Sequence, residues 1–441
     1  MQKFLCVNLV ARRRILADLD YVILRLGPDG KRAILPDPSV DEMLGSIRES
    51  HPNAGETLVA KRLERPLRHV HSVDTASLNE RQAADARRDP NSLLALNMPL
   101  SLIEPIHAGK ARSAASRSVS SEAKDAWGVL EVLGSNSADL SGAGVKIAVL
   151  DTGIRGEHPA FVGANLTQKN FTSGADQDNH GHGTHCAGTI FGRDVDGKRI
   201  GVARGVTDIL VGKVLDDNGR GNISAVLEAL KWAHSEGANI VSMSLGFDFP
   251  ALQQRLQDSG NPQKIATSKA LKAYRENIAL FRTLVDFLLV ETADRKGMVI
   301  VAASGNESLR DENPDFVIDV SVPAAASPNI VSVGAASRSS AGLHIAPFSN
   351  INPKLCAPGV DILSAALDDK LRLDSGTSMA CPHVAGVAAL WWEWAETVNG
   401  RANGETVRAQ LLAGCNLNRF VPGLDFVDRG AGMVRAPQKA V

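Results

Sequence analysis

Four short stretches of this sequence carry side chains that together could perform acyl transfer. Asp151 follows an apolar run, His182 lies between two glycines, and Ser378 stands at the start of a long apolar stretch. A serine hydroxyl is a weak nucleophile at neutral pH, so it needs a histidine base that is oriented by a carboxylate. Asn306 follows another apolar run and offers an amide N–H to a developing oxyanion. The sequence therefore predicts a nucleophile, a base, an orienting acid and an oxyanion donor.

Each stretch on its own has a more ordinary interpretation. Residues 151–153 and 304–306 are typical turn sequences, and a serine at the start of a helix is a typical N-cap. His182 and His185 could share a helical face and bind a metal, but no carboxylate stands beside them at metal-ligand spacing. It is the combination of all four stretches that indicates chemistry.

Taken together, the four stretches resemble the subtilisin-like serine proteases, or subtilases. The order Asp, His, Ser along the chain is that family's order, and it differs from the orders in chymotrypsin-like proteases and α/β-hydrolases. The likeness covers roughly residues 123–438 and is most specific in the motifs GHGTHCAG and GTSMACPHVAG. It implies a serine endopeptidase with the catalytic triad Asp151, His182 and Ser378. It also implies an oxyanion hole formed by Asn306 and the backbone N–H of Ser378.

The same resemblance implies how a peptide would bind. Subtilases hold the substrate as an extended strand between two edge segments, which here are residues 217–221 and 244–246. The small and neutral walls around the side chain that precedes the cut bond suggest an apolar or medium-sized residue there. The implied substrate-binding residues are Gly219, Arg220, Gly221, Ser244, Leu245, Gly246, Ala303, Ser304 and Gly305.

Alternating strands and helices must position these residues. From about residue 123, short apolar strands alternate with helices, a pattern typical of a parallel sheet that is covered on both faces. Ligand sites in such sheets lie at the carboxyl ends of the strands. We therefore predict an α/β fold, which the resemblance makes a subtilisin-like three-layer sandwich with a mostly parallel central sheet. The predicted strands are 145–150, 209–214, 240–244, 298–303 and 330–335, and the predicted helices span 185–191, 223–236 and 377–394.

Residues 1–107 form a separate region that looks like a subtilase propeptide, a small α+β domain. A strand is predicted at 21–26, a helix at 39–49 and an extended tail at 102–107. Residues 108–122 are small, polar and basic, as in a linker that a protease can cut. By resemblance, the tail lies in the active-site cleft of the catalytic domain at 123–441. We predict a self-processing zymogen that is cut between about His107 and Ser121.

An insertion at 247–297 departs from the family pattern. Between Gly246 and Met298 lie 51 residues, more than a compact subtilase carries there. Helices are predicted at 250–258 and 266–292. One interpretation is a longer surface helix that packs on the core. The other is a rim that shapes substrate access or docks a protein partner. The predicted apolar stripe is Leu271, Tyr274, Ile278, Phe281, Leu284, Val285, Phe287 and Leu288.

Composition excludes several other classes of protein. The 441 residues are 44% hydrophobic with a net charge of -1, which argues against nucleic-acid or membrane-surface binding. Residues 1–120 carry 18 Lys and Arg against 14 Asp and Glu, whereas the remainder carries 30 against 35. These opposite net charges favour docking of the propeptide on the enzyme in cis. No stretch approaches the ~20 apolar residues of a membrane span.

Cysteine usage and the N-terminus bear on the compartment and on cofactors. The five cysteines are sparse and form no CxxC pair, so we expect free thiols, which suit a reducing compartment. The apolar run near the N-terminus is short and its main charge follows it, so a signal peptide is weakly supported. We expect a cytoplasmic protein, with secretion as the alternative. The chemistry requires no cofactor, and a structural calcium is a weaker expectation at Asp194 and Asp196.

Two other functions would use the same site. A transpeptidase or peptide-maturation protease forms the same acyl-enzyme and differs only in whether an amine or water attacks it. A non-catalytic pseudo-protease would bind peptides without cutting them, which the intact triad disfavours.

Overall fold

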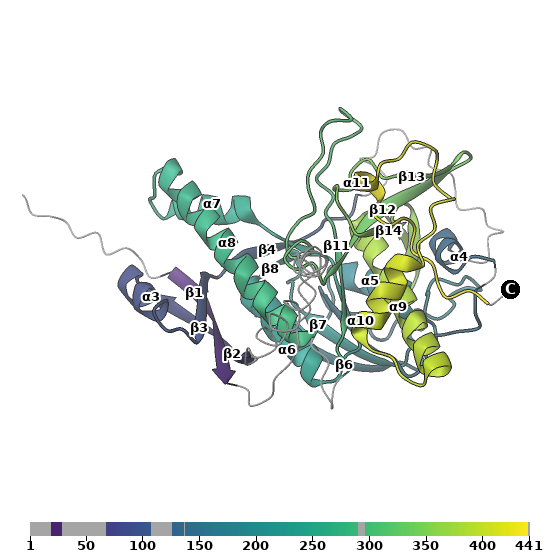
Figure 1. Ribbon diagram of the computed structural model, residues 1–441, viewed down its shortest axis with the longest axis horizontal. Coiled ribbons are helices and arrows are strands. Elements are labelled where there is room, and N and C mark those ends of the chain that lie inside the picture. The colour runs from purple at the N-terminus through teal and green to yellow at the C-terminus, as the bar shows by residue number, and fades with distance from the viewer. Residues whose placement is uncertain (1–18, 29–67, 107–125, 136, 290–295, 440–441) are drawn as a thin grey trace, which may run out of the picture.

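The computed structural model describes residues 19–28, 68–106, 126–135, 137–289 and 296–439 (Figure 1). The helix predicted at 39–49, the linker predicted at 108–122, His107 and Cys6 lie outside the described residues.

A mostly parallel sheet forms the centre of the larger domain, as predicted. Its strand order is β13-β12-β11-β9-β5-β7-β6, and β14 pairs with β12. All pairs are parallel except β12 with β13. The strands are β5 (Lys146–Asp151), β6 (Asn165–Asn170), β7 (Asp208–Lys213), β9 (Ile240–Met243), β11 (Val299–Ala303), β12 (Val331–Ser339), β13 (Gly342–Ile345) and β14 (Leu355–Pro358).

Alternate residues of the sheet enter two different cores, which makes the domain three-layered. Ile147 and Val149 of β5 pack in one hydrophobic cluster, whereas Ala148 and Leu150 pack in the other. The two faces of a strand point in opposite directions, so the two clusters lie on opposite faces of the sheet. The first cluster takes residues from α4 (Trp127–Leu133), α5 (His182–Phe191), α9 (Thr377–Asn399) and α10 (Gly404–Ala413), and the second from α6 (Ile223–Ser235), α7 (Phe249–Asp258) and α8 (Gln263–Leu288).

Short elements complete the larger domain. The helical turns η1 (Pro159–Phe161) and α11 (Phe426–Arg429) lie in its connections. Strands β15 (Ile362–Ala365) and β16 (Leu371–Asp374) form an antiparallel pair that leads directly into α9. Within the described ranges, no helix is both long and apolar enough to cross a membrane.

The N-terminal region contains a small α+β domain, as predicted. Strands β1 (Leu19–Pro28), β2 (Arg68–Leu78) and β3 (Ser92–Leu96) form an antiparallel sheet in the order β2-β1-β3. Helix α3 (Glu80–Ala86) starts at a capping box in which Asn79 and Gln82 satisfy each other's backbone N–H groups. Strand β4 (Pro99–Leu102) follows and leaves this sheet for the larger domain.

The insertion forms two helices, α7 and α8, but the predicted stripe is partly wrong. Phe281, Leu284, Val285 and Leu288 are buried, whereas Leu271 is 50% exposed. The buried face runs instead through the small residues Ala266, Ala270 and Ala273, and then through Asn277 and Leu280. Small side chains carry little hydrophobic signal, so the sequence pattern favoured the larger neighbour Leu271.

Candidate active site

Asp151 and His182 meet in the interior of the larger domain. Asp151 ends β5 and His182 begins α5, and the His182 Nδ1 lies 2.7 Å from the Asp151 Oδ1. Both side chains are at most 2% exposed. Only a glycine at position 183 permits this approach, because a Cβ there would lie 2.2 Å from the Gly153 carbonyl oxygen. The helix that carries His182 therefore packs directly on the loop that follows Asp151.

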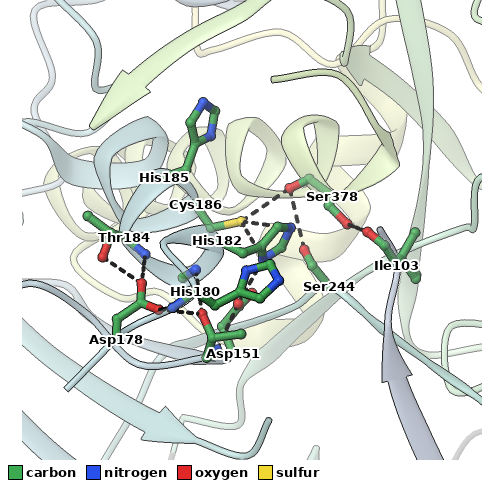
Figure 2. A network of polar contacts seen from close by, with 12 residues as sticks. Ile103, Asp151, Asp178, His180, His182, Thr184, His185, Cys186, Ser244 and Ser378 are labelled. Carbon is green, nitrogen blue, oxygen red and sulfur yellow. Dashed lines mark hydrogen bonds and ion pairs between the residues drawn. The ribbon is translucent and has the colours of Figure 1, made fainter. Parts of the chain in front are cut away.

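A second buried carboxylate, Asp178, ties the loops around this pair together (Figure 2). Its Oδ1 accepts from the Thr152 hydroxyl at 2.9 Å and from the backbone N–H groups of His180 and Gly181. Its Oδ2 accepts from the N–H and the hydroxyl of Thr184. Thr152 adjoins Asp151, and the other donors flank His182. Asp178 thus caps the N-terminus of α5, where negative charge is favourable, and fixes acid and base relative to each other.

The pKa of His182 is raised above its ordinary value. Burial lowers the pKa of this imidazole, but the charge and the hydrogen bond of Asp151 together outweigh that effect. The carboxylates of Asp374 and Asp178 raise the pKa further. Because Nδ1 faces the Asp151 carboxylate, the neutral ring carries its proton there and leaves Nε2 free to accept one.

Ser378 and Asn306 come together at the N-terminus of α9. The Asn306 Oδ1 accepts from the Thr377 backbone N–H at 2.8 Å and from the Thr377 hydroxyl at 2.9 Å. These bonds turn the amide nitrogen of Asn306 away from the helix. A Cβ at position 376 would lie 2.9 Å from that nitrogen, so glycine keeps the space clear. An N–H donor and the Ser378 hydroxyl therefore line the same helix terminus.

Residues 99–106 run through this site and are here called the inserted segment. They belong to the N-terminal region and are distinct from the insertion at 247–297. Strand β4 pairs antiparallel with both β8 (Arg220–Asn222) and β10 (Leu245–Phe247). Beyond β4, the Ile103 N–H donates to the Ser244 carbonyl at 3.3 Å and the Ile106 N–H to the Ser375 carbonyl at 2.7 Å. The inserted segment is thus extended up to and past Ser378, as predicted for the tail that begins at residue 102.

The inserted segment presents two successive carbonyls to the candidate catalytic groups. The Ser378 Oγ donates to the Ile103 carbonyl at 2.9 Å (Figure 2), whereas the Asn306 Nδ2 donates to the Glu104 carbonyl at 2.9 Å. A carbonyl under attack must face the nucleophile and the oxyanion donor at once. Here the Ser378 Oγ and the Asn306 Nδ2 instead contact the carbonyls of two successive residues, Ile103 and Glu104. Ser378 and His182 are both fully buried.

The structure brings most of the predicted substrate-binding residues to the inserted segment. Ser101 lies opposite both Gly246 and Arg220, Leu100 lies opposite Gly221, and the Leu102 N–H donates to the Gly219 carbonyl. Leu245 lies opposite Leu102, and a Cβ at Gly246 would lie 3.8 Å from the Ile103 Cγ1. Ala303 ends β11 inside the core, and Ser304 and Gly305 follow it toward Asn306.

Cys186 lies beside the triad but is not a competing nucleophile. Its Sγ is 3.8 Å from the His182 Nδ1 and 3.4 Å from the Ser378 carbonyl oxygen. Asp151, His182 and Cys186 offer ligand atoms within 4.8 Å of one another. Burial raises the pKa of this thiol well above its ordinary value, so it stays protonated and is a poor nucleophile or metal ligand. The four cysteines in the described ranges are all free.

Asp194, one of the two predicted calcium ligands, is paired with the side chain of Arg204. Both carboxylate oxygens of Asp194 lie within 3.0 Å of the Arg204 Nη1. Asp196 is exposed on the same turn. The guanidinium occupies the side of Asp194 that a calcium ion would need, so this residue pair fits calcium poorly. A structural calcium at Asp194 and Asp196 stays a prediction.

Sequence reasoning missed Lys213, a buried cation beneath the site. Lys213 ends β7, is fully buried, and donates to the Thr152 carbonyl at 2.7 Å and to Asp217 at 2.8 Å. Asp217 also accepts from Asn179, and its pKa is lowered chiefly by the hydrogen bond from Lys213. The lysine joins the loop after Asp151 to residues beside His182. Its one signal in the sequence is a charge at the end of an otherwise apolar strand, next to the predicted edge segment.

Comparisons with known proteins agree with this geometry. The subtilase family model matches residues 142–426. The major intracellular serine protease of Bacillus subtilis (strain 168) is 32% identical over 284 residues, which cover 62% of this chain and 76% of that protein. Subtilisin BL of Lederbergia lenta is 33% identical over 271 residues, 60% of this chain and 82% of that protein. A cuticle-degrading serine protease of Arthrobotrys oligospora is 35% identical over 285 residues, but this chain spans only 57% of its length.

The family match therefore covers the sheet, both helices that carry the candidate base and nucleophile, and the Asn306 loop, and it begins after the N-terminal domain. The chain belongs to the subtilase family and is a subtilisin-like serine endopeptidase.

Proposed function

We propose that Ser378 is the nucleophile, His182 the general base and Asp151 its orienting acid. The Ser378 Oγ attacks the peptide carbonyl while its proton passes to the His182 Nε2. Asp151 stabilises the imidazolium that forms, and the Asn306 Nδ2 and the Ser378 backbone N–H stabilise the oxyanion. His182 then gives the proton to the leaving amine, and water hydrolyses the acyl-enzyme by the same steps. The single observation that carries this proposal is a peptide carbonyl 2.9 Å from the Ser378 Oγ, beside a buried Asp–His pair.

We propose extended peptides with aliphatic side chains as substrates. The inserted segment occupies the position of a bound peptide, and its Leu100, Leu102 and Ile103 are all at most 3% exposed. Backbone pairing with β8 and β10 gives affinity, and these buried positions give selectivity. A fluorogenic peptide with the sequence Leu-Ser-Leu-Ile before the reporter tests this. Hydrolysis well above that of the same peptide ending in Leu-Ser-Leu-Asp is the expected result, and equal rates would contradict it.

We also propose that the chain is made as a latent, self-processing zymogen. Nucleophile and oxyanion donor hold successive carbonyls, so the inserted segment blocks the site without being in position for cleavage. Cleavage would need one carbonyl to face both the Ser378 Oγ and the Asn306 Nδ2. A cut between about His107 and Ser121 remains a prediction outside the described residues, and the bond after Ile103 is the one nearest Ser378. The transpeptidase alternative shares every step up to the acyl-enzyme.

Activity should fall on the acid side at a pH above the ordinary histidine value. The base must be neutral to accept the Ser378 proton, and the pKa of His182 is raised. Activity is therefore full only above that raised pKa and declines as the pH falls through it, beginning above ~6.5. The pH dependence of kcat/KM on the peptide above measures this. An acid limb centred below ~6 would contradict the raised pKa.

Replacing Asp178 with asparagine should impair catalysis while leaving the fold intact. The variant Asp178→Asn keeps the size of the side chain but places an amide N–H against the N–H and hydroxyl donors of Thr184. Losing these hydrogen bonds lets the first turn of α5, and His182 with it, move. We expect a fall in kcat of about 10- to 100-fold, as for a small misplacement of a catalytic group. The acid limb should also move to lower pH, because Asp178 raises the His182 pKa.

The matched control for that variant is Asp176→Asn, an exposed residue two positions away. It removes the same charge from the same loop without breaking the buried bonds. Near-normal kcat and an unmoved acid limb are expected for this control. Equal effects in the two variants would show that general surface charge, and not the bonds of Asp178, governs the site.

The compartment of this chain is a proposal as well. The Bacillus subtilis relative and one from Paenibacillus polymyxa are named intracellular serine proteases, whereas other relatives are named cuticle-degrading. The four cysteines of the described residues are free, and free thiols suit a reducing compartment. We propose a cytoplasmic enzyme on these grounds.

A further inference from the structure

A buried lysine joins the edge of the peptide-binding cleft to the loops around the candidate acid and base. Lys213 ends β7, and its side chain is fully buried. Its ammonium donates to the Thr152 carbonyl at 2.7 Å and to the Asp217 Oδ1 at 2.8 Å. The Asp217 Oδ2 accepts from the Asn179 amide at 2.8 Å. The lysine and its carboxylate therefore link the turn after β7 to the loop after β5 and to the loop before α5.

These contacts close a ring of hydrogen bonds. The Thr152 hydroxyl donates to the Asp178 Oδ1 at 2.9 Å, and Asp178 is followed in the chain by Asn179. The candidate acid directly precedes Thr152, and Asp178 caps the helix that begins at the candidate base. The ring thus has one side against the catalytic pair. Its members are Thr152, Lys213, Asp217, Asn179 and Asp178.

The other side of the ring holds a turn that receives the peptide backbone. This turn, here called the substrate-edge turn, runs from Asp216 to Gly219, and the Gly219 N–H donates to the Asp216 carbonyl at 3.0 Å. The Gly219 carbonyl accepts from the Leu102 N–H of the inserted segment at 2.7 Å. Asp217 lies within the turn, so its bond to Lys213 fixes where the Gly219 carbonyl lies relative to the catalytic pair.

Stability alone is a poor reason for a lysine at this position. Burying a charge costs free energy, and an apolar side chain of similar volume is often as stable or more so. Asp217 is 37% exposed, so water screens part of its attraction for Lys213. The ammonium does supply two directed hydrogen bonds from one atom to two separate loops, which an apolar side chain cannot form. Its contribution is therefore to the relative position of those loops.

We propose that Lys213 is a positioning residue that aligns the substrate-edge turn with the candidate triad. An extended peptide held at Gly219 then presents its carbonyl to Ser378. The inference deepens the proposed function and rests on it. Contacts far from the reacting carbonyl raise kcat only when the protein connects them rigidly to the catalytic groups. Lys213 provides this connection, and a peptide too short to reach Gly219 gains nothing from it.

Two peptides of different length test this role in the full chain. The long peptide is acetyl-Leu-Ser-Leu-Ile before a fluorogenic reporter, and its third residue carries the N–H that Leu102 gives to the Gly219 carbonyl. The short peptide is acetyl-Ile before the same reporter and lacks that N–H. The chain is left to process itself, and active sites are counted with a fluorophosphonate label. In the parent, kcat per active site should be at least about tenfold higher for the long peptide.

The variant Lys213→Met should lower kcat for the long peptide about 10- to 100-fold and leave kcat for the short peptide within about threefold of the parent. Methionine is apolar and of similar length, so it fits the buried site, while Asp217 stays partly in water. Asp217→Asn should act in the same direction. The two changes combined should cost no more than Lys213→Met alone, because both weaken the same bond.

The matched control is Lys169→Met, the same substitution on the neighbouring strand. Lys169 pairs with Gly212 in the sheet and is exposed, with its ammonium over the Phe171 ring. Both kcat values of this control should stay within about twofold of the parent. A selective loss on the long peptide equal to that in Lys213→Met would overturn the proposal, because loss of positive charge alone would then be the cause.

The ratio of the two kcat values separates positioning from a merely structural role. Equal losses on both peptides, or no loss on either, in Lys213→Met would overturn the inference. Additive losses in the double variant would do so as well. These outcomes leave the proposed function intact, since the parent still hydrolyses both peptides. A parent chain that hydrolyses neither peptide would instead refute the proposed function, and this inference with it.

Discussion

Replacing Ser378 with alanine is expected to lower kcat for peptide hydrolysis by about 10⁴- to 10⁶-fold, the usual cost of losing a triad member. The Ser378 hydroxyl is the one that faces the peptide carbonyl, whereas the neighbouring Thr377 hydroxyl donates to Asn306. The neighbouring Cys186 thiol stays protonated because burial raises its pKa. Since Ser378 is second in α9 and alanine suits a helix, the fold should persist. Steady-state hydrolysis of the Leu-Ser-Leu-Ile peptide measures the loss.

The matched control for this variant is Ser340→Ala, an exposed serine at a strand end far along the chain from the motif. It should leave kcat and KM within experimental error of the parent. Circular dichroism spectra of the three proteins, recorded on the uncut chains, should match. A pure Ser378→Ala protein that still turns over peptide at a substantial fraction of the parent rate would refute the assignment of the nucleophile.

Replacing Asn306 with alanine is expected to lower kcat by about 10²- to 10³-fold with little change in KM, as found for loss of one oxyanion-hole donor. The charge on the oxygen develops only in the transition state, so the lost bond affects the chemical step more than binding. In the latent chain the same Nδ2 holds the Glu104 carbonyl, which supports its aim at a peptide oxygen. Separate kcat and KM values measure the effect.

Asn306 also anchors the Thr377 N–H and hydroxyl, so a second variant must separate anchoring from catalysis. Asn306→Asp keeps an oxygen for both Thr377 donors and removes the amide N–H. It should lose at least as much kcat as the alanine variant, because its carboxylate repels the oxyanion. Near-normal kcat in Asn306→Asp would show that the anchoring of Thr377, and not an oxyanion bond, is what matters.

The parts of the fold that depend on local pattern could be predicted from the sequence. Strands such as 145–150 are mostly apolar runs that are followed by a polar side chain, here Asp151. Their parallel arrangement follows from their alternation with helices. Asp151, His182, Asn306 and Ser378 stand in distinctive motifs, and the structure brings them together in two groups around one peptide segment. For Leu271 and the small-residue face of α8, by contrast, hydrophobicity alone was misleading.

The rest depends on contacts between distant segments, which periodicity does not encode. Asp178 acquires its importance only when the fold brings Thr152, 26 residues earlier in the chain, against its carboxylate. Lys213 becomes a buried donor to the Thr152 carbonyl, 61 residues away in the chain, only because β7 lies beside β5. The one-residue offset between Ile103 and Glu104 arises from the relative positions of Ser378 and Asn306, and no local pattern specifies it. The ion pair between Lys269 of α8 and Glu80 of α3 likewise joins residues 189 apart in the chain.

The central claim is that Ser378 acts on peptide bonds, including one in its own chain. The most direct test is the intact mass of the purified full-length wild-type and Ser378→Ala proteins, followed over time. The wild type should convert into two fragments whose boundary lies between Ile103 and Ser121, with the masses placing the cut after Ile103 or in the linker. The Ser378→Ala protein should keep the mass of the whole chain. Conversion of both proteins at the same rate and to the same fragments would contradict the account.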